Sequence, residues 1–412
     1  MQWRLYLYKV KRVYHFFKTA LGQAIPAMIQ TNFPQRKLVI IAITGTDGKT
    51  TTSSLIHYIL TQAGIKTGLI STLGAKIGND EIETGLHVTN PTPKLLFQII
   101  KKMVDQDCTH LVIEMTSHGA YQFRNFGLTP QIGAITNVSH EHFDYHLNFR
   151  QYVLAKASLF HHTPKVWINQ EDQSFTLLKK VLKQHLVAYS PSSYLPLVIK
   201  QSVRARFDQA YNQLNAKLAS LIAIELKIDP KIIAQAIKKF PQLSGRMQQI
   251  SNSRKIRVIV DFAHTPKAVE AALLSLKTQR SNAKGRLITV LGSAGQRDVT
   301  KRPKMGKLAA EHADLVIFTA EDPRVENVWS IITQLKSNLG KNHHKVLSIA
   351  DRGAAIYFAI NHLAKAGDTV VILGKGHEKS LCFGQDEHSW SDTEAAELAL
   401  KHQKPVLGPI IS

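Results

Sequence analysis

A glycine-rich segment that ends in a lysine and three threonines is the part of the sequence best suited to chemistry. It reads GTDGKTTT at residues 45–52 and follows the apolar run LVIIAIT at residues 38–44. Glycines let backbone N–H groups approach phosphate oxygens, and the amino end of a following helix adds a partial positive charge. Lys49 is placed to reach the terminal phosphates of a nucleotide and Thr50 to bind Mg²⁺, although Ile43 stands where the general pattern GxxxxGK[ST] has glycine. The predicted nucleotide-binding residues here are Gly45, Thr46, Asp47, Gly48, Lys49, Thr50 and Thr51.

Two further polar residues stand close to the ends of apolar runs. Glu114 lies near the end of HLVIEM at residues 110–115, and His142 follows QIGAITN at residues 131–137. Functional residues of open α/β sheets gather at the carboxyl ends of the strands. A single glutamate or histidine at the end of a strand is usually a solvated side chain or a capping group. Both residues are nevertheless expected beside the phosphate loop in one sheet, which favours a functional role.

Short apolar runs alternate with helix-length segments along the chain, which predicts an α/β fold whose parallel sheets are covered on both faces. Further strand-like runs lie at 66–72, 165–169, 256–262, 286–292, 314–320, 345–350 and 368–374, and helical segments at 49–63, 93–106, 150–160, 207–226 and 229–239. Pro241 and Gly245 separate two blocks of this alternation. We therefore expect an N-terminal segment at 1–37, a central phosphate-loop domain at 38–242 and a second α/β domain at 243–412.

The composition is that of a globular protein with an unusual charge. The chain has 52 Lys and Arg against 30 Asp and Glu, a formal net charge of +22. Such a surface suits nucleic acid, nucleotides or anionic membranes. The basic residues are spread along the chain and no segment resembles a nucleic-acid-reading module, so no nucleic acid partner is expected. Cys108 and Cys382 lie far apart in apolar stretches, which predicts a reducing, cytoplasmic location without disulfides.

Residues 1–37 form a basic amphipathic segment. Apolar and aromatic residues such as Trp3 and Phe17 are interleaved there with Arg4, Lys9 and Lys18. No apolar run approaches the ~20 residues of a transmembrane helix. The charges fall inside the apolar part, which is unlike a signal peptide. Residues 1–25 could lie peripherally on the surface of the inner membrane or pack as a helix on the following domain, and packing is slightly favoured.

The phosphate loop resembles the variant TGTxGKTTT of the Mur ligases and folylpolyglutamate synthetases. The motifs downstream resemble, in the same order, those of the MurE-type enzymes, which add the third amino acid to UDP-N-acetylmuramoyl-L-alanyl-D-glutamate in peptidoglycan synthesis. These motifs are HVTNPTP (87–93), IEMTSHGAYQFR (113–124), TNVSHEHFDYH (136–146), YVLAKASLF (152–160), LSGRMQ (243–248), VDFAHTP (260–266), GSAGQRDVTKRP (292–303), EDPRVE (321–326) and GKGHE (374–378). The resemblance covers about residues 38 to 400.

The resemblance implies a central phosphate-loop domain followed by a C-terminal Rossmann-like domain. Family members also have an N-terminal domain that binds the UDP moiety of the substrate. Only 37 residues precede the strand before the phosphate loop. We therefore expect the UDP-binding domain to be missing, which leaves open how a UDP-linked substrate is held.

The family chemistry implies an ATP-dependent ligase that activates a carboxylate as an acyl phosphate and joins it to an amine. The implied catalytic residues are Lys49, Glu114, His142 and Lys156, and the implied magnesium ligands are Thr50, Glu114, His142 and a carbamylated Lys156. Further ATP-binding residues implied by the resemblance are Asn137, Asn212, Asn215, Arg246, Asp261 and His264. Two departures are Asp47, which replaces asparagine, and His140-Glu141, which replaces Arg-Asp.

The resemblance also implies two substrate sites. The muropeptide is expected at Thr89, Asn90, Ser117 and Arg124, and the incoming amino acid at Asp322, Arg324, Gly374 and Glu378. Enzymes that add diaminopimelate carry Asp-Asn-Pro-Arg, and here the stretch is Glu-Asp-Pro-Arg at 321–324. An arginine near a carboxylate suits a zwitterionic end better than a bare ammonium group, so meso-diaminopimelate is predicted over lysine.

Two other classes of function stay open. A ligase of the same chemistry could act on another carboxylate, such as a lipid-linked or free muropeptide, a folate or a polyamide, although GKGHE and DPR argue against a folate. The other class is a nucleotide-binding protein without ligase activity. The joint presence of Glu114, His142, Lys156 and Arg324 argues against that class.

Overall fold

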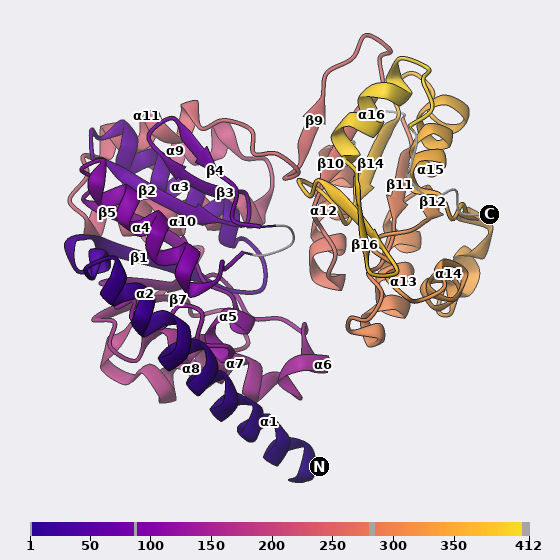
Figure 1. Ribbon diagram of the computed structural model, residues 1–412. Helices are drawn as coiled ribbons and strands as arrows, with labels where there is room; N and C mark the ends of the chain where they lie inside the picture. The colour runs from indigo at the N-terminus through magenta and orange to yellow at the C-terminus, as the bar shows by residue number, and fades with distance from the viewer. Residues whose placement is uncertain (1, 86–88, 280–284, 406–412) are drawn as a thin grey trace. The chain divides into compact units, whose positions relative to one another are not determined.

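The computed structural model describes residues 2–85, 89–279 and 285–405, and the chain forms two compact units, Met1–Pro241 and Gln242–Ser412 (Figure 1). Each unit is built around a mainly parallel sheet, which confirms the predicted α/β class. Among the helices of these described stretches, none combines the length and the apolar character that crossing a bilayer requires.

The first unit contains an eight-stranded sheet in the order β4-β3-β2-β5-β1-β6-β7-β8. The strands are β1 Val39–Thr44, β2 Thr67–Ser71, β3 Gly74–Ile77, β4 Asp80–Ile82, β5 His110–Glu114, β6 Ile132–Ile135, β7 Lys165–Asn169 and β8 Leu186–Tyr189. The strands from β2 to β8 in this order are parallel, and β3 and β4 add an antiparallel edge. All five strands predicted in this part are present. The sequence reading missed β3, β4 and β8, which are short and include exposed or half-buried residues.

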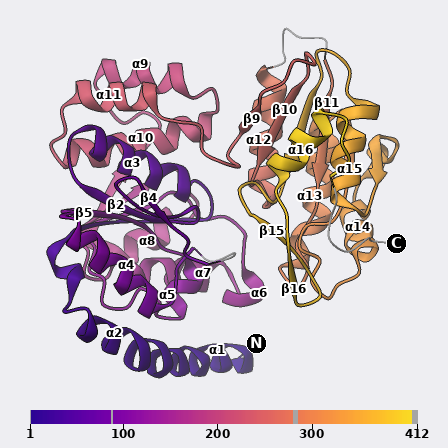
Figure 2. The same ribbon diagram turned by 45° about the horizontal axis from the view of Figure 1, so that its top comes forward.

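Helices cover both faces of this sheet, as predicted (Figure 2). On one face, α9, α10 and α11 form a layer outside α3, while α4, α7 and α8 pack on the other. Their bounds are α3 Lys49–Gln62, α4 Pro93–Asp105, α5 Ser117–Tyr121, α6 Phe143–His146, α7 Phe149–Ala157, η3 Ser158–Phe160, α8 Phe175–Leu182, η4 Lys183–His185, α9 Leu197–Arg206, α10 Ala210–Glu225 and α11 Pro230–Lys239. The parallel strands are apolar along nearly their whole length because both faces are covered.

The N-terminal residues form a nearly continuous helix that packs on this unit. It consists of α1 Gln2–His15, the π-helix η1 Phe16–Ala24 and α2 Ile25–Gln30, and is followed by the 3₁₀-helix η2 Pro34–Lys37. The buried Tyr8 accepts a hydrogen bond from the Tyr121 hydroxyl at its carbonyl, and its own hydroxyl lies 3.0 Å from Nδ1 of His146. The Phe16 ring meets the Phe123 ring at 5.4 Å. One face of the helix therefore belongs to the core of the first unit.

The second unit contains a six-stranded sheet in the order β13-β12-β11-β14-β10-β9. Its strands are β9 Gln248–Ile250, β10 Arg257–Asp261, β11 Leu287–Leu291, β12 Leu315–Phe318, β13 Val346–Ser348 and β14 Thr369–Leu373, and a separate hairpin pairs β15 Ser380–Phe383 with β16 Asp386–Ser389. The five predicted strands are present and parallel. The antiparallel β9 and the hairpin were not predicted, because all three strands have only three or four residues and β9 and β16 are mostly polar.

Two hydrophobic cores lie on opposite faces of this second sheet. The helices are α12 Pro266–Gln279, η5 Val299–Lys301, α13 Arg302–His312, α14 Val328–Lys336, η6 Gly340–Lys345, α15 Arg352–Phe358, the π-helix η7 Ala359–Leu363 and α16 Asp392–Leu400. The first core includes side chains of α12, α13 and α14, and the second includes side chains of α15, η7 and α16. This double covering fixes the carboxyl ends of the strands, where the predicted site residues of this unit lie.

Candidate active site

The phosphate loop connects β1 to α3 in the first unit. Gly45 and Gly48 have φ values of 151° and 82°, a backbone region that favours glycine. A Cβ atom at Gly45 would lie 1.9 Å from Oγ1 of Thr136, so glycine is also required by space. Ile43 is a fully buried residue of β1 that pairs with Glu114 and Ala134. The departure from the general pattern thus falls within the sheet and leaves the loop itself intact.

The loop backbone is held by Asn137, which follows β6. Its side-chain oxygen accepts a 3.1 Å hydrogen bond from the amide of Asp47, and its amide nitrogen donates one of 2.9 Å to the Asp47 carbonyl. The Thr136 hydroxyl donates a further bond of 2.6 Å to the same carbonyl. Asn137, predicted to bind ATP, therefore braces the loop in the structure. Thr136 is a loop-bracing residue that the sequence reading missed.

Lys49 begins α3 and folds over the loop. Its ammonium group donates to the carbonyl oxygens of Gly45 at 3.2 Å and Thr46 at 2.8 Å. These carbonyls hold the charge close to the loop, where the terminal phosphates of a bound nucleotide would lie. The side-chain oxygen of Asn215 on α10 lies beside Gly48, 2.4 Å from where a Cβ atom would be. Asn212 is one turn away, and its Oδ1 accepts a 3.4 Å hydrogen bond from the Asn215 amide.

Glu114 lies at the carboxyl end of β5 and is fully buried. Its carboxylate accepts hydrogen bonds from the hydroxyls of Thr50 at 3.3 Å, Ser53 at 3.2 Å and Thr72 at 3.0 Å. A hydroxyl and a carboxylate beside a phosphate loop are the hard oxygen donors that Mg²⁺ takes together with phosphate oxygens. Thr50 and Glu114 therefore fit one magnesium ion. Ser53 and Thr72 complete this group and were not predicted.

Lys156 on α7 is buried beneath the loop. Its Nζ atom donates a 2.7 Å hydrogen bond to the Gly45 carbonyl and lies 4.4 Å from the centre of the Tyr152 ring. Burial, together with the neighbouring Lys49 cation, lowers the pKa of Lys156 well below its usual range, while Asp47 and Glu141 oppose the shift. The Tyr152 hydroxyl lies 3.2 Å from Oγ1 of Thr46. Tyr152 thus joins α7 to the loop, a role that the sequence did not reveal.

His142 has a φ of 58° and precedes α6. Its ring lies 4.6 Å from the ring of His118, and its Nδ1 atom lies 4.0 Å from a carboxylate oxygen of Glu141. Within residues 2–85, 89–279 and 285–405, no group of three or more His, Cys, Asp or Glu side chains is placed to hold a metal. The set of Glu114, His142 and carbamylated Lys156 around a second magnesium ion stays a prediction.

Asn90 connects the predicted muropeptide residues to Glu114. Its amide donates a 2.7 Å hydrogen bond to the Glu114 carbonyl, and Arg124 donates one of 3.0 Å to the Asn90 carbonyl. Thr89 lies 3.0 Å from the Thr72 hydroxyl, and Ser117 is buried at the start of α5. Two residues of the predicted HVTNPTP segment, at positions 87 and 88, lie outside the described residues. The four residues predicted for the muropeptide all lie near the carboxyl end of β5: Thr89, Asn90, Ser117 and Arg124.

The second unit contains three residues predicted to bind ATP. Arg246 lies just before β9, Asp261 is the last residue of β10, and His264 lies in the turn that follows β10. Asp261 accepts hydrogen bonds from the amides of Met247 at 2.6 Å and Ala263 at 2.9 Å, so its carboxylate holds the turn. The Arg246 guanidinium lies 4.5 Å from the centre of the Phe262 ring. Nδ1 of His264 lies 2.8 Å from the Phe262 carbonyl oxygen. Asp261 is thus a structural acceptor, while Arg246 and His264 flank one aromatic ring.

Two of the residues predicted for the amino acid, Asp322 and Glu378, form ion pairs with Lys375, which was not predicted. The buried Lys375 ammonium lies 2.8 Å from Asp322 and 2.5 Å from Glu378. Arg324 donates to the Gly295 carbonyl at 2.7 Å, and its other terminal nitrogen lies 4.0 Å from Asp322. Asp322 and Arg324 have φ values of 40° and 54°, a strained backbone region for residues other than glycine.

Gly374 and Glu321 complete this group. Gly374 has a φ of 113°, and a Cβ atom there would lie 2.2 Å from Oε2 of Glu321. Glu321 is buried, and this burial raises the pKa of its carboxyl to about 7 against the opposing cations of Arg352 and Lys301. The arrangement therefore combines acidic and basic side chains after the carboxyl ends of β12 and β14.

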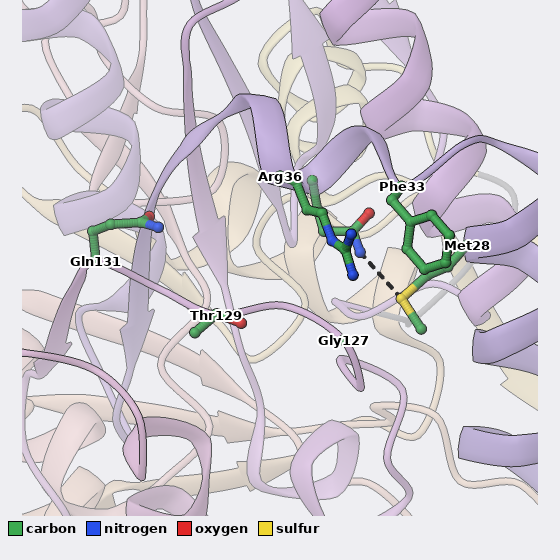
Figure 3. Close-up of a pocket in the computed structure, with 7 residues that line it drawn as sticks. Met28, Phe33, Arg36, Gly127, Thr129 and Gln131 are labelled. Atoms are coloured by element: carbon green, nitrogen blue, oxygen red, sulfur yellow. Dashed lines mark hydrogen bonds between the residues drawn. The ribbon is translucent and has the colours of Figure 1, made fainter.

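A separate pocket of about 450 Å³ lies near the amino ends of strands β1 and β6 of the first sheet (Figure 3). It is lined by residues before β1 and β6, including Met28, Arg36 and Gln131. The Gln35 amide donates a hydrogen bond to the Met28 sulfur at 3.1 Å, and Gln131 accepts one from the Ile40 amide at 2.6 Å. Because these residues precede the strands, the pocket faces away from the phosphate loop and contributes nothing to this site.

Comparison with known proteins identifies the two units. The family model of the Mur ligase middle domain matches residues 43–234, and that of the Mur ligase, glutamate ligase domain matches residues 245–376. The UDP-N-acetylmuramoyl-L-alanyl-D-glutamate–2,6-diaminopimelate ligase of Bacillus licheniformis is 35% identical over 401 residues, covering 90% of this chain and 80% of that protein.

Two solved structures have a similar fold. A UDP-N-acetylmuramoyl-L-alanyl-D-glutamate–2,6-diaminopimelate ligase aligns with a TM-score of 0.58 and 29% identity, over 91% of this chain and 82% of its own. The folylpolyglutamate synthase of Mycobacterium tuberculosis, solved with ADP, aligns with a TM-score of 0.65 and 17% identity. The alignment covers 86% of this chain and 92% of that protein. The order of the site residues, the two family matches and these similarities lead to one conclusion: the chain belongs to the Mur ligases, a family of ATP-dependent enzymes that form amide bonds.

Proposed function

We propose that the chain joins meso-diaminopimelate to the D-glutamate carboxylate of a muramoyl-L-alanyl-D-glutamate substrate. The observation that carries this proposal is the Thr50–Glu114 pair at 3.3 Å beside the phosphate loop, connected through Asn90 to Arg124. This continuous group could hold ATP at one end and an anionic peptide at the other. The similar ligases named for this substrate and diaminopimelate support the choice of both reactants.

The reaction would proceed in two steps. An oxygen of the substrate carboxylate attacks the γ-phosphorus of ATP, the bond to the bridging oxygen breaks and ADP leaves. The neutral amine then attacks the acyl carbon, inorganic phosphate leaves and the nitrogen loses a proton. Both steps bring anions together, so Lys49 would stabilise the charge that develops on the phosphates. A magnesium ion held by Thr50 and Glu114 would supply further positive charge there.

Lys156 would act in its carbamylated form. A lysine amine adds carbon dioxide only when it is neutral, and burial together with Lys49 lowers the pKa of Lys156. The carbamate would carry a negative charge and offer oxygen atoms to a second magnesium ion, with Glu114 and His142 as the other ligands. Lys49, also close to Gly45, would offset that charge.

Arg324 would select the amino acid through its distal carboxylate. The guanidinium is held by the Gly295 carbonyl, with Asp322 4.0 Å away. A fixed arginine can bind a carboxylate through two parallel hydrogen bonds. Lysine as a substrate has no distal carboxylate to accept them. Glu378 and Gly374 would contact the distal ammonium group. These contacts favour diaminopimelate over lysine.

Release of inorganic phosphate tests the assignment directly. The full-length protein would be incubated with Mg-ATP and bicarbonate, together with UDP-N-acetylmuramoyl-L-Ala-D-Glu and either meso-diaminopimelate or lysine. Release that requires both the muropeptide and diaminopimelate is the expected result. Binding of ATP without release under any of these conditions would overturn this substrate assignment and point to a carboxylate that is not carried on UDP, such as a lipid-linked muropeptide.

We also propose a cytoplasmic enzyme that contacts the inner membrane surface through residues 1–25. Outside the face that packs on the unit, α1 and the start of η1 expose apolar side chains at helical spacing: Trp3, Tyr6, Leu7, Val10, Val13, Tyr14 and Phe17. Trp3 is 67% and Phe17 61% exposed. Arg4, Lys9, Lys11 and Lys18 border this stripe, and no acidic residue precedes Asp47. Aromatic residues bordered by cations favour the interface of an anionic bilayer.

A further inference from the structure

A second pocket, of about 290 Å³, lies between the N-terminal helix and the predicted muropeptide residues. One wall comes from the end of α1 and from η1, with His15, Lys18 and Gln23. The other wall comes from the start of α4 and from the turn after α5, which contributes Gln122 and Arg124. Two segments far apart in sequence thus place a cation on each wall of one pocket.

The positive charge of this pocket is not balanced locally. None of the described residues that line it is acidic. Burial, followed by the cations of Lys18 and Arg124, lowers the pKa of His15. The influence of these two cations on one imidazole means that all three groups share a small region of positive potential. An anionic ligand is the partner that such a region favours.

The Arg124 side chain is pre-organised to bind such a ligand. Its Nε atom donates a 2.8 Å hydrogen bond to the Gln122 side chain, and its Nη1 atom donates one of 3.0 Å to the Asn90 carbonyl. These bonds fix the plane of the guanidinium, and Nη2 is the remaining donor group. Because the geometry is already set, little side-chain entropy is lost when an anion binds.

The pocket is also connected to the reaction site. Asn90, which accepts from Arg124, donates to the Glu114 carbonyl at 2.7 Å. An extended substrate whose carboxylate lies near Glu114 could therefore pass Asn90 and reach the pocket with its far end. In a muropeptide whose reacting group is the D-glutamate carboxylate, the far end is the sugar with its diphosphate.

We propose that this pocket binds the diphosphate group of the activated muropeptide, with Lys18 and Arg124 on opposite sides of it. The inference rests on the proposed muropeptide substrate and adds a binding site built partly from the N-terminal helix. A diphosphate carries negative charge on two linked groups, which matches two cations on facing walls better than a single carboxylate does. The same group occurs in nucleotide-linked and lipid-linked muropeptides, so the pocket chemistry suits both.

Calorimetric binding to the full-length protein, without ATP, tests this site. Three ligands would be compared: UDP-N-acetylmuramoyl-L-Ala-D-Glu, the same muramoyl dipeptide without diphosphate, and a polyprenyl-diphosphate-linked muramoyl dipeptide in detergent micelles. The variant is Lys18→Gln, and Lys37→Gln is the matched control because Lys37 is also exposed and lies outside the pocket. Loss of one charge-assisted hydrogen bond should weaken diphosphate binding about tenfold.

The expected result is a weaker affinity of Lys18→Gln for at least one diphosphate ligand, with an unchanged affinity for the diphosphate-free dipeptide. The ligand that shows the difference identifies the source of the diphosphate. Equal affinities of the native chain and Lys18→Gln, an equal loss for all three ligands, or no binding of either diphosphate ligand would overturn the proposal. Phosphate release is measured separately, so a Lys18-dependent affinity without turnover would retain the pocket and remove the ligase assignment.

Discussion

The Nζ atom of Lys156 lies 2.7 Å from the carbonyl oxygen of Gly45, the first residue of the phosphate loop. Lys49 donates to the same carbonyl from the other side at 3.2 Å. Two lysines therefore converge on one backbone oxygen, and Lys156 is the buried one. Their mutual repulsion and the burial favour the neutral form of Lys156, which is the form that reacts with carbon dioxide.

Replacing Lys156 with alanine should reduce turnover about a hundredfold or more, because an anionic group beside the phosphates would be lost. Short-chain carboxylic acids should restore part of the activity by supplying the missing carboxylate. Phosphate release with and without such acids would measure both effects, and Lys180→Ala on the exposed part of α8 is the control. Full activity of the Lys156→Ala variant would exclude the carbamate.

Lys49→Ala should eliminate ATP turnover, because the ammonium group that the loop carbonyls hold near the phosphates is removed. The expected loss is again on the order of a hundredfold or more. Phosphate release measures turnover, and circular dichroism would verify that the fold is kept. If turnover persisted at the native rate, the phosphate-loop assignment would have to be abandoned.

The alternation of apolar runs was sufficient to predict every parallel strand of both sheets except β8, since buried parallel strands are apolar throughout. It could not reveal β3, β4, β8 or the β15–β16 hairpin, because these strands have only three or four residues, and those of β4 and β16 are mostly polar and exposed. The phosphate loop could be predicted because glycines and lysine occupy fixed positions after a strand. The role of Lys375 could not be predicted, because its burial and its ion pairs with Asp322 and Glu378 arise only through tertiary packing.

Tyr8 and Tyr152 illustrate the same limit within the first unit. Each forms its decisive contact with a residue far away in sequence, His146 for Tyr8 and Thr46 for Tyr152. Neither spacing nor periodicity carries information on such pairs. The residues that brace a site are therefore harder to predict than the residues whose type already indicates chemistry.

Arg324→Ala should raise the KM for diaminopimelate about tenfold or more, because a charge-assisted contact with its distal carboxylate would be lost. Lysine has no such carboxylate, so its KM should change little and serves as the control substrate. Steady-state kinetics with both amino acids would measure the difference. An unchanged KM for diaminopimelate in the variant would contradict the assignment of Arg324.

Glu321 predicts a pH dependence of stability in the second unit. Its pKa is raised from the usual 4.5 to about 7 in the folded protein, chiefly by burial. The folded state then binds more protons than the unfolded state between these values, so stability is greatest below 4.5 and falls as pH rises to about 7. The loss amounts to roughly 3 kcal/mol at most.

Glu321→Gln removes this titration and should make the variant more stable than the native chain at pH 8, with a smaller difference at pH 5. Denaturant unfolding at both pH values would measure the effect, and Glu394→Gln on the exposed start of α16 is the control. A native stability that did not fall between pH 5 and pH 8, relative to Glu321→Gln, would contradict the raised pKa.

Membrane contact should depend on the exposed stripe of α1 and on anionic lipid. The full-length protein is expected to sediment with vesicles that contain phosphatidylglycerol and to remain in solution with purely zwitterionic vesicles, because each nearby cation contributes about 1 kcal/mol at an anionic surface. The double variant Trp3→Ala/Phe17→Ala should lose most of this binding, since both side chains are exposed and absent from the core. Trp329→Ala, which removes an exposed tryptophan of the second unit, is the control. Equal sedimentation of the native chain and the double variant would mean that the charge of the whole surface, rather than the α1 stripe, attracts the lipid.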